Sequence, residues 1–212
     1  MVSLRGWASF PDELPVFDPD TTPAAPHELF IGWLNEAGEH VLAPHAATLS
    51  TVDIDGTPDA RVVILKDVGA GGWAIATSSE SPKGLQLRKH PHAALTFFWP
   101  GRGRQIRLRG PVTPATPEVS AEDFLARPSA SRVEAFIGRQ SAVLHDPAEL
   151  LDAAREAERW VAENPEVAPE TWTRYLIAPE EVEFWQAGHD RRHVRLRYRR
   201  EGDAWVRERL WP

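Results

Sequence analysis

Short β-patterned segments joined by glycine-containing turns constrain the fold of this chain most. The segments with the clearest strand pattern are residues 46–52, 59–66, 73–77, 93–99 and 104–112. Between the first two, the sequence Asp-Ile-Asp-Gly-Thr-Pro is typical of a hairpin turn, with Gly56 free to take a positive φ. Strands that follow one another at this spacing favour an antiparallel barrel over a parallel doubly wound sheet. The apolar run within 59–66 also predicts that this strand is buried on both faces.

Helical patterns and further strands fill the rest of the chain. Apolar residues recur every three or four positions in residues 27–40, 118–126, 130–137 and 146–163, which predicts helices there. A shorter helix is expected after Ser81, because serine is a good N-cap and Pro82 suits the first helical position. Strand-like segments end the chain at residues 173–177, 181–186, 195–200 and 204–210. The predicted fold class is α+β, mainly β: an antiparallel barrel with flanking helices.

Two regions are expected along the chain. Residues 1–26 are expected to form an extended arm because of their prolines, Pro11, Pro15, Pro19, Pro23 and Pro26. Residues 27–212 are expected to form a single domain, since a chain of 212 residues suits one domain of about 100–200 residues.

The composition excludes several classes of protein and site. The chain has no cysteine, so disulfide scaffolds, thiolate metal sites and cysteine nucleophiles are ruled out. It contains no apolar run of the ~18 residues that a membrane span needs, and its first residues do not resemble a secretory signal. We therefore expect a cytoplasmic protein with no membrane partner. The net charge of −7 argues against nucleic acid as a partner.

Arginines are concentrated at the end of the chain, against this acidic background. They are Arg191, Arg192, Arg195, Arg197, Arg199, Arg200, Arg207 and Arg209. A strand face exposed to solvent is one interpretation. An anion site is another, because guanidinium groups bind phosphate or carboxylate in a planar, bidentate manner. The cluster also keeps a nucleic-acid-binding barrel among the alternatives.

No common catalytic motif identifies an enzyme. The patterns GxGxxG, GxxxxGK[ST] and GxSxG are absent. His189 and His193 are four residues apart, as two metal ligands on a helix would be. They lie in an expected turn that leads into a strand, so no metal site is predicted.

Cationic side chains are repeatedly paired with hydrogen-bonding side chains near the expected strand ends. They are Arg61 and Lys66; Thr77, Ser78, Ser79, Ser81 and Lys83; Arg104 and Gln105; and Arg139, Gln140 and Ser141. Each group alone is consistent with an ordinary polar surface. Together they favour a phosphate-bearing ligand that lies across the barrel, with the free N–H groups of a helix N-terminus as additional donors.

The order of several short stretches resembles one enzyme family. The stretches are Arg61–Lys66, Arg104-Gln105, Arg127-Pro128 with Ser131, Gln140-Ser141, Glu183–Gln186, Arg191–His193, Arg195 and Arg209–Pro212. In this order they resemble the pyridoxamine/pyridoxine 5′-phosphate oxidases, and the likeness runs from about His27 to Pro212. The resemblance implies a split β-barrel that binds FMN and works as a homodimer. It also implies an oxidase that uses oxygen as its acceptor.

The resemblance assigns roles to individual residues. The implied FMN-binding residues are Arg61, Val62, Val63, Ile64, Leu65, Lys66, Ala76, Thr77, Lys83, Gln105, Gln140, Ser141, Trp185 and Arg195. The members of this set that would come from the partner subunit are Gln140, Ser141, Trp185 and Arg195. The implied substrate-binding residues are Lys66, Arg127, Ser131, Arg191 and His193, the last two also forming the implied catalytic pair. These residue types suit the ligands, because a phosphate dianion binds to Arg, Lys and hydroxyl donors.

Departures from the family pattern fall mainly on the substrate side. Asp123 and Ser129 stand where the family usually has Tyr and Arg, and Val194 stands where it has Asp. Pro82 replaces an Arg on the side of the FMN phosphate. The leading hypothesis is an FMN-dependent oxidase that converts pyridoxamine or pyridoxine 5′-phosphate to pyridoxal 5′-phosphate. The alternatives are the same fold with FMN acting on another substrate, as in flavin oxidases of phenazine pathways, and a non-catalytic flavin-binding protein.

Overall fold

The computed structural model describes residue 3 and residues 6–212, so residues 1, 2, 4 and 5 of the expected N-terminal arm lie outside the described residues. The helices are α1 (Pro26–Gly38), α2 (Pro82–Lys89), α3 (Pro117–Leu125), α4 (Ser129–Ile137) and α5 (Pro147–Glu163), with short 3-10 turns η1 (Pro19–Thr21) and η2 (Pro100–Arg102). The strands are β1 (Ala46–Val52), β2 (Pro58–Ile64), β3 (Asp67–Gly69), β4 (Gly72–Ser78), β5 (His92–Trp99), β6 (Arg104–Pro114), β7 (Trp172–Ile177), β8 (Glu181–Gln186), β9 (Val194–Glu201) and β10 (Ala204–Arg209). Every expected helix and strand is present, and β3 is an additional strand that the sequence analysis did not anticipate.

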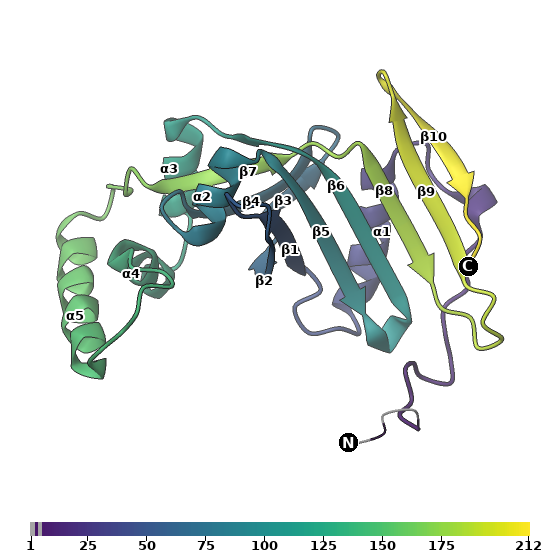
Figure 1. Cartoon of the computed structure of the whole chain (residues 1–212), viewed down its shortest axis with the longest axis horizontal. Helices are drawn as coiled ribbons and strands as arrows, with labels where there is room; N and C mark the ends of the chain where they lie inside the picture. The colour runs from purple at the N-terminus through teal and green to yellow at the C-terminus, as the bar shows by residue number, and fades with distance from the viewer. Residues whose placement is uncertain (1–2, 4–5) are drawn as a thin grey trace.

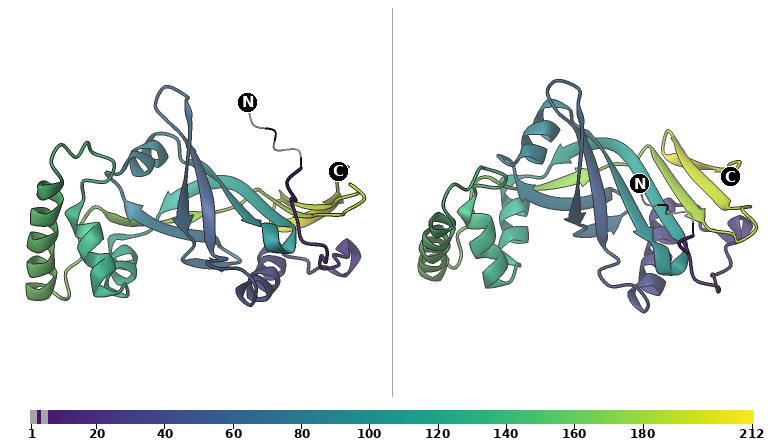
Figure 2. Two further views of the ribbon diagram at one scale, coloured as in Figure 1. Left: turned by 90° about the horizontal axis from the view of Figure 1, so that it is seen from below. Right: turned by 60° about the horizontal axis from the view of Figure 1, so that its bottom comes forward.

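The strands form an antiparallel sheet that divides along β6 (Figure 1). The main path runs β10-β9-β8-β6-β5-β1-β2. The first part of β6, residues 104–109, pairs with β8, whereas its end, residues 112–114, pairs with β7. From β7 the second arm continues through β4 to β3. This arrangement confirms the expected antiparallel split barrel, and Figure 2 shows its curl from two further directions.

Gly110 allows the sheet to divide where it does. It lies in β6 between the segment that pairs with β8 and the segment that pairs with β7. A Cβ atom at this position would lie 2.1 Å from the carbonyl oxygen of Ala178, in the connection between β7 and β8. Only glycine fits such a close approach of two backbones.

The core lies between α1 and the sheet. Phe30 of α1 is fully buried, and its ring centroid lies 5.8 Å from that of Trp73 and 4.8 Å from that of Phe97. Trp33 of the same helix packs edge-on against Phe184. Deleting a buried aromatic side chain of this kind costs about 3–5 kcal/mol. Since the partner rings belong to β4, β5 and β8, α1 holds both arms of the divided sheet together.

The expectation that the strand at 59–66 is buried on both faces is wrong. In the structure β2 lies at the edge of the sheet and pairs with β1. Val62 is 68% exposed and Ile64 is 45% exposed. The apolar run is uncovered because the described chain has no strand beyond β2. Hydrophobicity alone does not show whether a strand is covered by its own chain or by another surface.

A pair of helices, α4 and α5, lies beside the sheet at one end of the molecule (Figure 2). The rings of Phe136 and Trp160 stack between them, with centroids 4.1 Å apart. The segment from α3 to α4 faces β2 and β4 across a cavity. Within residue 3 and residues 6–212, the helices lack the length and apolar character of a membrane span.

Candidate functional site

A cavity of about 1230 Å³ lies between β2, β4 and the segment from α3 to the loop after α4. Ligand sites typically occupy about 300–1,000 Å³, so this cavity can hold a nucleotide-sized molecule. The predicted site residues that line it are Arg61, Val62, Val63, Ile64, Lys66, Ala76, Thr77, Lys83, Arg127, Ser131, Gln140 and Ser141. We term it the basic groove, after its cations Arg61, Lys66, Lys83, Arg127 and Arg139. A second cavity of about 800 Å³, which includes Thr51, His92 and Arg199, is lined by none of the predicted site residues.

Arg61 is held in place by a network at the edge of the basic groove. Its guanidinium donates to Thr51 Oγ1, to Gln86 Oε1 at 3.0 Å and to the carboxylate of Asp59. Thr51 and Gln86 are buried and join β1 to α2 through a hydrogen bond of their own. The hydrogen bond from Gln86 and the charge of Arg61 keep the pKa of Asp59 below its ordinary value. Arg61 is therefore oriented before a ligand binds.

Lys83 enters the groove from the first turn of α2. Ser81 caps this helix as predicted, because its Oγ atom accepts a hydrogen bond from the Gly84 amide at 3.3 Å. Lys83 Nζ donates to Gln140 Oε1 at 2.7 Å. Burial, together with the positive charge of Arg61, lowers the pKa of Lys83. A bound anion would offset both effects, so this part of the groove favours a negatively charged ligand.

Asp123 lies among the cations that the resemblance assigns to the substrate. Its Oδ1 atom is 3.8 Å from Lys66 Nζ, and its Oδ2 atom accepts a hydrogen bond from Trp172 Nε1 at 2.9 Å. Arg127 lies over the Trp172 ring, with its Cζ atom 4.2 Å from the ring centroid. Since Lys66, Arg127 and Asp123 all line the groove, the carboxylate faces any ligand that the two cations hold.

The donor set of the basic groove fits a cofactor that carries a phosphate. Arg127 Nη1 is buried and has no hydrogen-bond partner among the described residues, and an anionic oxygen would satisfy it. Burial lowers the pKa of Arg127, as expected for a buried cation whose charge the neighbouring acids balance only in part. Thr77 and Ser131 add hydroxyl donors to the same space. These donors suit phosphate, and the described residues contain no cluster of side chains that could hold a metal.

Gln140 and Ser141 lie in the basic groove of the chain that carries them. The resemblance implies that they reach the cofactor from the partner subunit. In the structure, however, Gln140 is bonded to Lys83 of its own chain, and both residues line the same cavity as Arg61. The loop after α4 therefore places both residues in the groove of their own chain, and the subunit from which they would contact a cofactor stays a prediction.

Other predicted cofactor residues lie outside the groove. Gln105, Trp185 and Arg195 are cross-strand neighbours on β6, β8 and β9, so they share one face of the sheet. We term these three residues the Trp185 row. The side chain of Leu65 packs in the core instead of lining the groove. A single chain thus carries two separate sets of predicted residues.

Arg191 and His193 lie in the loop between β8 and β9, close to the Trp185 row. The His193 and Trp185 rings are 4.7 Å apart, and His193 Nδ1 accepts a hydrogen bond from the Gly188 amide at 3.1 Å. Arg191 is exposed and has a φ of 66°, a left-handed conformation that costs a non-glycine residue about 1–3 kcal/mol. Ser141 in the groove has a φ of 68°. Strained backbone of this kind is often found at ligand sites, and the roles of both residues stay predictions.

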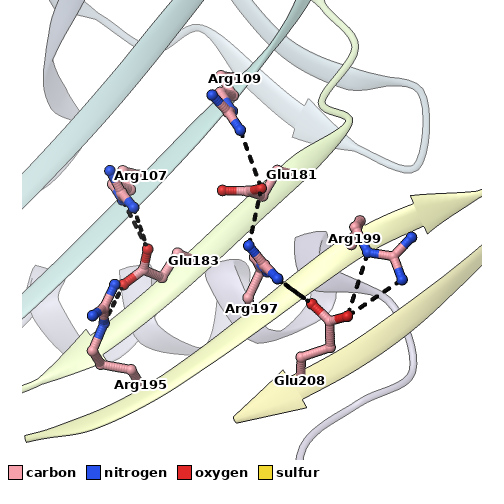
Figure 3. A network of polar contacts seen from close by, with 8 residues as sticks. All are labelled: Arg107, Arg109, Glu181, Glu183, Arg195, Arg197, Arg199 and Glu208. Atoms are coloured by element: carbon pink, nitrogen blue, oxygen red, sulfur yellow. Dashed lines mark hydrogen bonds and ion pairs between the residues drawn. The ribbon is translucent and has the colours of Figure 1, made fainter. Parts of the chain in front are cut away.

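Arginine and glutamate side chains alternate across the sheet face beside the Trp185 row (Figure 3). We term the set the charge ladder; its members are Arg107, Arg109, Glu181, Glu183, Arg195, Arg197, Arg199 and Glu208. Arg197, for example, lies 2.6 Å from Glu208. Outside the ladder, Arg209 pairs with Asp20. The C-terminal arginines are therefore largely compensated on a strand face and do not converge on one anion site.

Some residues that hold the predicted cations had no expected role in the site. Thr51 and Gln86 bind Arg61, and Glu183 binds Arg195. Glu183 carried no clear signal, because β8 reads Glu-Val-Glu-Phe-Trp-Gln and an acid that alternates with Val182 and Phe184 has the pattern of an exposed residue. Thr51 and Gln86 are ordinary polar residues whose partners are distant in the sequence, so no local pattern marks them.

Comparison with solved structures defines the class of fold. PhzG from Burkholderia lata 383, in complex with tetrahydrophenazine-1-carboxylic acid, has a TM-score of 0.85 at 30% identity, over 97% of this chain and 100% of that chain. A pyridoxamine 5′-phosphate oxidase-related, FMN-binding protein from Nostoc punctiforme PCC 73102 has a TM-score of 0.74 at 16% identity, over 89% of this chain and 98% of that chain. The chain thus has the split-barrel fold of proteins related to pyridoxamine 5′-phosphate oxidase.

Sequence comparisons then place the chain in one family. The family model of pyridoxamine 5′-phosphate oxidase matches residues 35–168, and that of the pyridoxine 5′-phosphate oxidase C-terminal dimerisation region matches residues 172–212. A pyridoxine/pyridoxamine 5′-phosphate oxidase from Ectopseudomonas mendocina (strain ymp) is 42% identical over 193 residues, which cover 90% of each chain. One from Legionella pneumophila (strain Lens) is 41% identical over 179 residues, 84% of this chain and 81% of that one. The chain belongs to the pyridoxamine 5′-phosphate oxidase family and is an oxidoreductase, which favours an enzyme over the non-catalytic alternative.

Proposed function

We propose that the chain is an FMN-dependent oxidase that converts pyridoxamine or pyridoxine 5′-phosphate to pyridoxal 5′-phosphate, with oxygen as the acceptor. The observation that carries the proposal is the donor set of the basic groove. Lys66, Arg127 and Ser131 line one cavity, and Arg127 Nη1 has no partner among the described residues. A phosphate group suits these donors, and the 42% identity to a named oxidase supports the same substrate class.

The edge strand and the start of α2 would hold the cofactor. Arg61 and Lys83 bring two cations to the groove, which suits the FMN phosphate. Residues 62–64 of β2, with Ala76 and Thr77 of β4, would line the ring system. The chemistry supplied by bound FMN is acceptance of a hydride from the substrate carbon and reoxidation by oxygen, which yields peroxide.

The remaining groove cations would hold and orient the substrate. Lys66, Arg127 and Ser131 would bind its phosphate. Arg191 and His193 would lie over its ring, where an imidazole can accept or donate a proton near neutral pH. The contribution of the chain is mainly positioning, because a fixed geometry between substrate and cofactor replaces a bimolecular encounter.

A homodimer would bring the two sets of predicted residues together. The Trp185 row and the loop with Arg191 lie outside the groove of their own chain, so a second chain would have to supply them. Val62 and Ile64 on the exposed edge of β2 form an apolar surface that a second copy can cover. The match of the dimerisation region to residues 172–212, which include Trp185 and Arg195, supports this arrangement.

The direct test combines activity with cofactor analysis. Purified protein is assayed for pyridoxal 5′-phosphate formation and oxygen consumption with pyridoxamine 5′-phosphate as substrate, and FMN is quantified in the same sample. We expect turnover in proportion to the FMN content. Protein that contains FMN but forms no pyridoxal 5′-phosphate would refute this substrate assignment.

A second candidate keeps the fold and FMN but changes the substrate. The observation that favours it is Asp123, whose carboxylate lies 3.8 Å from Lys66 and would repel a phosphate dianion. PhzG, at 30% identity, is solved with tetrahydrophenazine-1-carboxylic acid. A monocarboxylate carries less charge and would be repelled less. Oxidation of this acid, measured in parallel with oxidation of pyridoxamine 5′-phosphate, distinguishes the two candidates.

A further inference from the structure

Glu183 is a buried acid to which the proposed function gives no role. It lies in β8, and 2% of its side chain is exposed. Its neighbour in the charge ladder, Glu181, is 17% exposed. Burying a carboxylate costs several kcal/mol unless cations and hydrogen bonds compensate it. The partners of Glu183 therefore determine what this residue does.

Two arginines compensate Glu183, one on each carboxylate oxygen (Figure 3). Arg195 Nε donates to Oε1 at 2.7 Å, and Arg107 Nε donates to Oε2 at 2.8 Å. Burial raises the pKa of Glu183, but the hydrogen bonds from Arg195 and Arg107 outweigh it and hold the pKa below its ordinary value. Glu183 is therefore a charged anchor for both guanidinium groups.

The contact with Glu183 fixes the orientation of Arg195. Arg195 Nη1 donates to the carbonyl oxygen of Trp211 at 2.8 Å. With Nε and Nη1 engaged, Nη2 has no acceptor among the described residues. Two acceptors on a planar guanidinium leave it little freedom to rotate. Arg195 is thus held with Nη2 available as a donor, on the sheet face that it shares with Trp185 and Gln105.

We propose that Glu183 is a positioning residue for FMN, which acts by holding Arg195 in the orientation that meets the cofactor. The inference rests on the proposed function, since that function assigns Arg195 to FMN. If Glu183 acts in this way, removing its charge weakens FMN binding only in a chain that still has Arg195.

Glu181 provides a matched control on the same strand. It faces the same side of the sheet two residues away, and it lies 3.4 Å from Arg109 and 3.6 Å from Arg197. Neither of these arginines belongs to the predicted site. The substitutions Glu183→Gln and Glu181→Gln therefore remove the same charge from the same sheet face, but only the first changes the support of Arg195.

The experiment measures FMN release when the purified holoprotein is diluted, followed by the rise in flavin fluorescence. We expect Glu183→Gln to weaken FMN binding about tenfold, the scale on which outer-shell partners act at metal sites. The FMN affinity of Glu181→Gln should stay within about twofold of wild type, because the ion pairs of Glu181 are more exposed and contribute little. An unchanged affinity in Glu183→Gln, or equal losses in both variants, would overturn the inference.

A double-mutant cycle separates positioning from a general structural role. Arg195→Ala alone should weaken FMN binding, and adding Glu183→Gln to it should cause no further loss. If the two losses multiply, Glu183 acts independently of Arg195 and the inference is wrong. Should Glu183→Gln fail to fold, Glu183→Asp keeps the charge but withdraws the carboxylate by one methylene, and full FMN affinity in that variant would also overturn the inference.

The same data distinguish this inference from the proposed function. Wild-type protein that binds no FMN would refute the proposed function itself. Wild-type protein that binds FMN, with a Glu183→Gln variant of equal affinity, would refute only the role of Glu183.

Discussion

Replacing Asp123 by Asn tests whether this carboxylate opposes a phosphorylated substrate. Asparagine keeps an oxygen acceptor for Trp172 Nε1, so the hydrogen bond of 2.9 Å and the packing of Arg127 on the indole ring are retained. The substitution removes the negative charge that lies 3.8 Å from Lys66 Nζ. Binding of a phosphate at Lys66 should therefore become stronger.

The geometry sets the size of the effect. Unit charges about 4 Å apart interact by about 1 kcal/mol in water and about 4 kcal/mol at the effective dielectric constant near a protein surface. A phosphate bound to Lys66 would lie about as far from Asp123 as Lys66 Nζ does, which is 3.8 Å, or somewhat farther; because Lys66 and Asp123 are 27% and 12% exposed, its repulsion by Asp123 falls in the lower part of this range. We expect a gain of about 1–2 kcal/mol for the phosphate, which corresponds to a KM about 5- to 30-fold lower.

The assay compares KM and kcat of wild type and Asp123→Asn for pyridoxamine 5′-phosphate. Pyridoxamine, which lacks the phosphate, is the matched substrate and should show little change in KM. FMN content and kcat should also be nearly unchanged, because the substitution leaves the cofactor residues intact. An unchanged or higher KM for the phosphorylated substrate would refute the electrostatic argument.

Three further predictions concern backbone strain, close packing and pH. Arg191→Gly relieves the left-handed φ of 66°, so the variant should keep its thermal stability and its bound FMN. Its turnover should fall at least tenfold, which is about the effect of losing one good substrate contact. Full turnover would show that Arg191 has no role at the substrate. Gly110→Ala should lower stability by about 1–3 kcal/mol or more, because its Cβ would overlap Ala178, whereas Gly101→Ala has open space and should be tolerated; equal melting temperatures would contradict this. Since the pKa of Glu183 is lowered in the folded state, its stabilising contribution is complete above the ordinary glutamate pKa of about 4.3 and is lost as the pH falls below it. The difference in urea midpoint between wild type and Glu183→Gln should therefore shrink from pH 7 to pH 3.5, and a constant difference would contradict the assignment.

Local signals in the sequence were sufficient to predict most of the fold. Ser81 was predicted as an N-cap because a serine hydroxyl can accept a first-turn amide hydrogen bond and Pro82 suits the first helical position, and the structure confirms it. The alternation of strands and turns likewise predicted the antiparallel arrangement. The three-residue strand β3 was not predictable, because Asp67–Gly69 becomes a strand only through its pairing with β4.

The site was harder to predict than the fold, because several of its contacts join segments that are far apart in the sequence. The resemblance named the groove cations, but it could not show that Asp123 faces Lys66 or that Gln140 bonds Lys83 within one chain. Both contacts depend on how α3 and the loop after α4 are placed against the sheet. The exposure of Val62 was not predictable for a different reason. An apolar strand has the same sequence pattern whether its own chain or a partner covers it.

The central claim is that the basic groove of one chain and the Trp185 row of another form a single FMN site. The measurement that tests it most directly is the FMN content of a co-expressed mixture of Arg61→Ala and Arg195→Ala chains. Each variant alone should retain little FMN. With random pairing, half of the dimers combine the two variants, and each of these has one intact site, so the mixture should regain about a quarter of the wild-type FMN. A mixture that retains no more FMN than either variant alone would contradict the account.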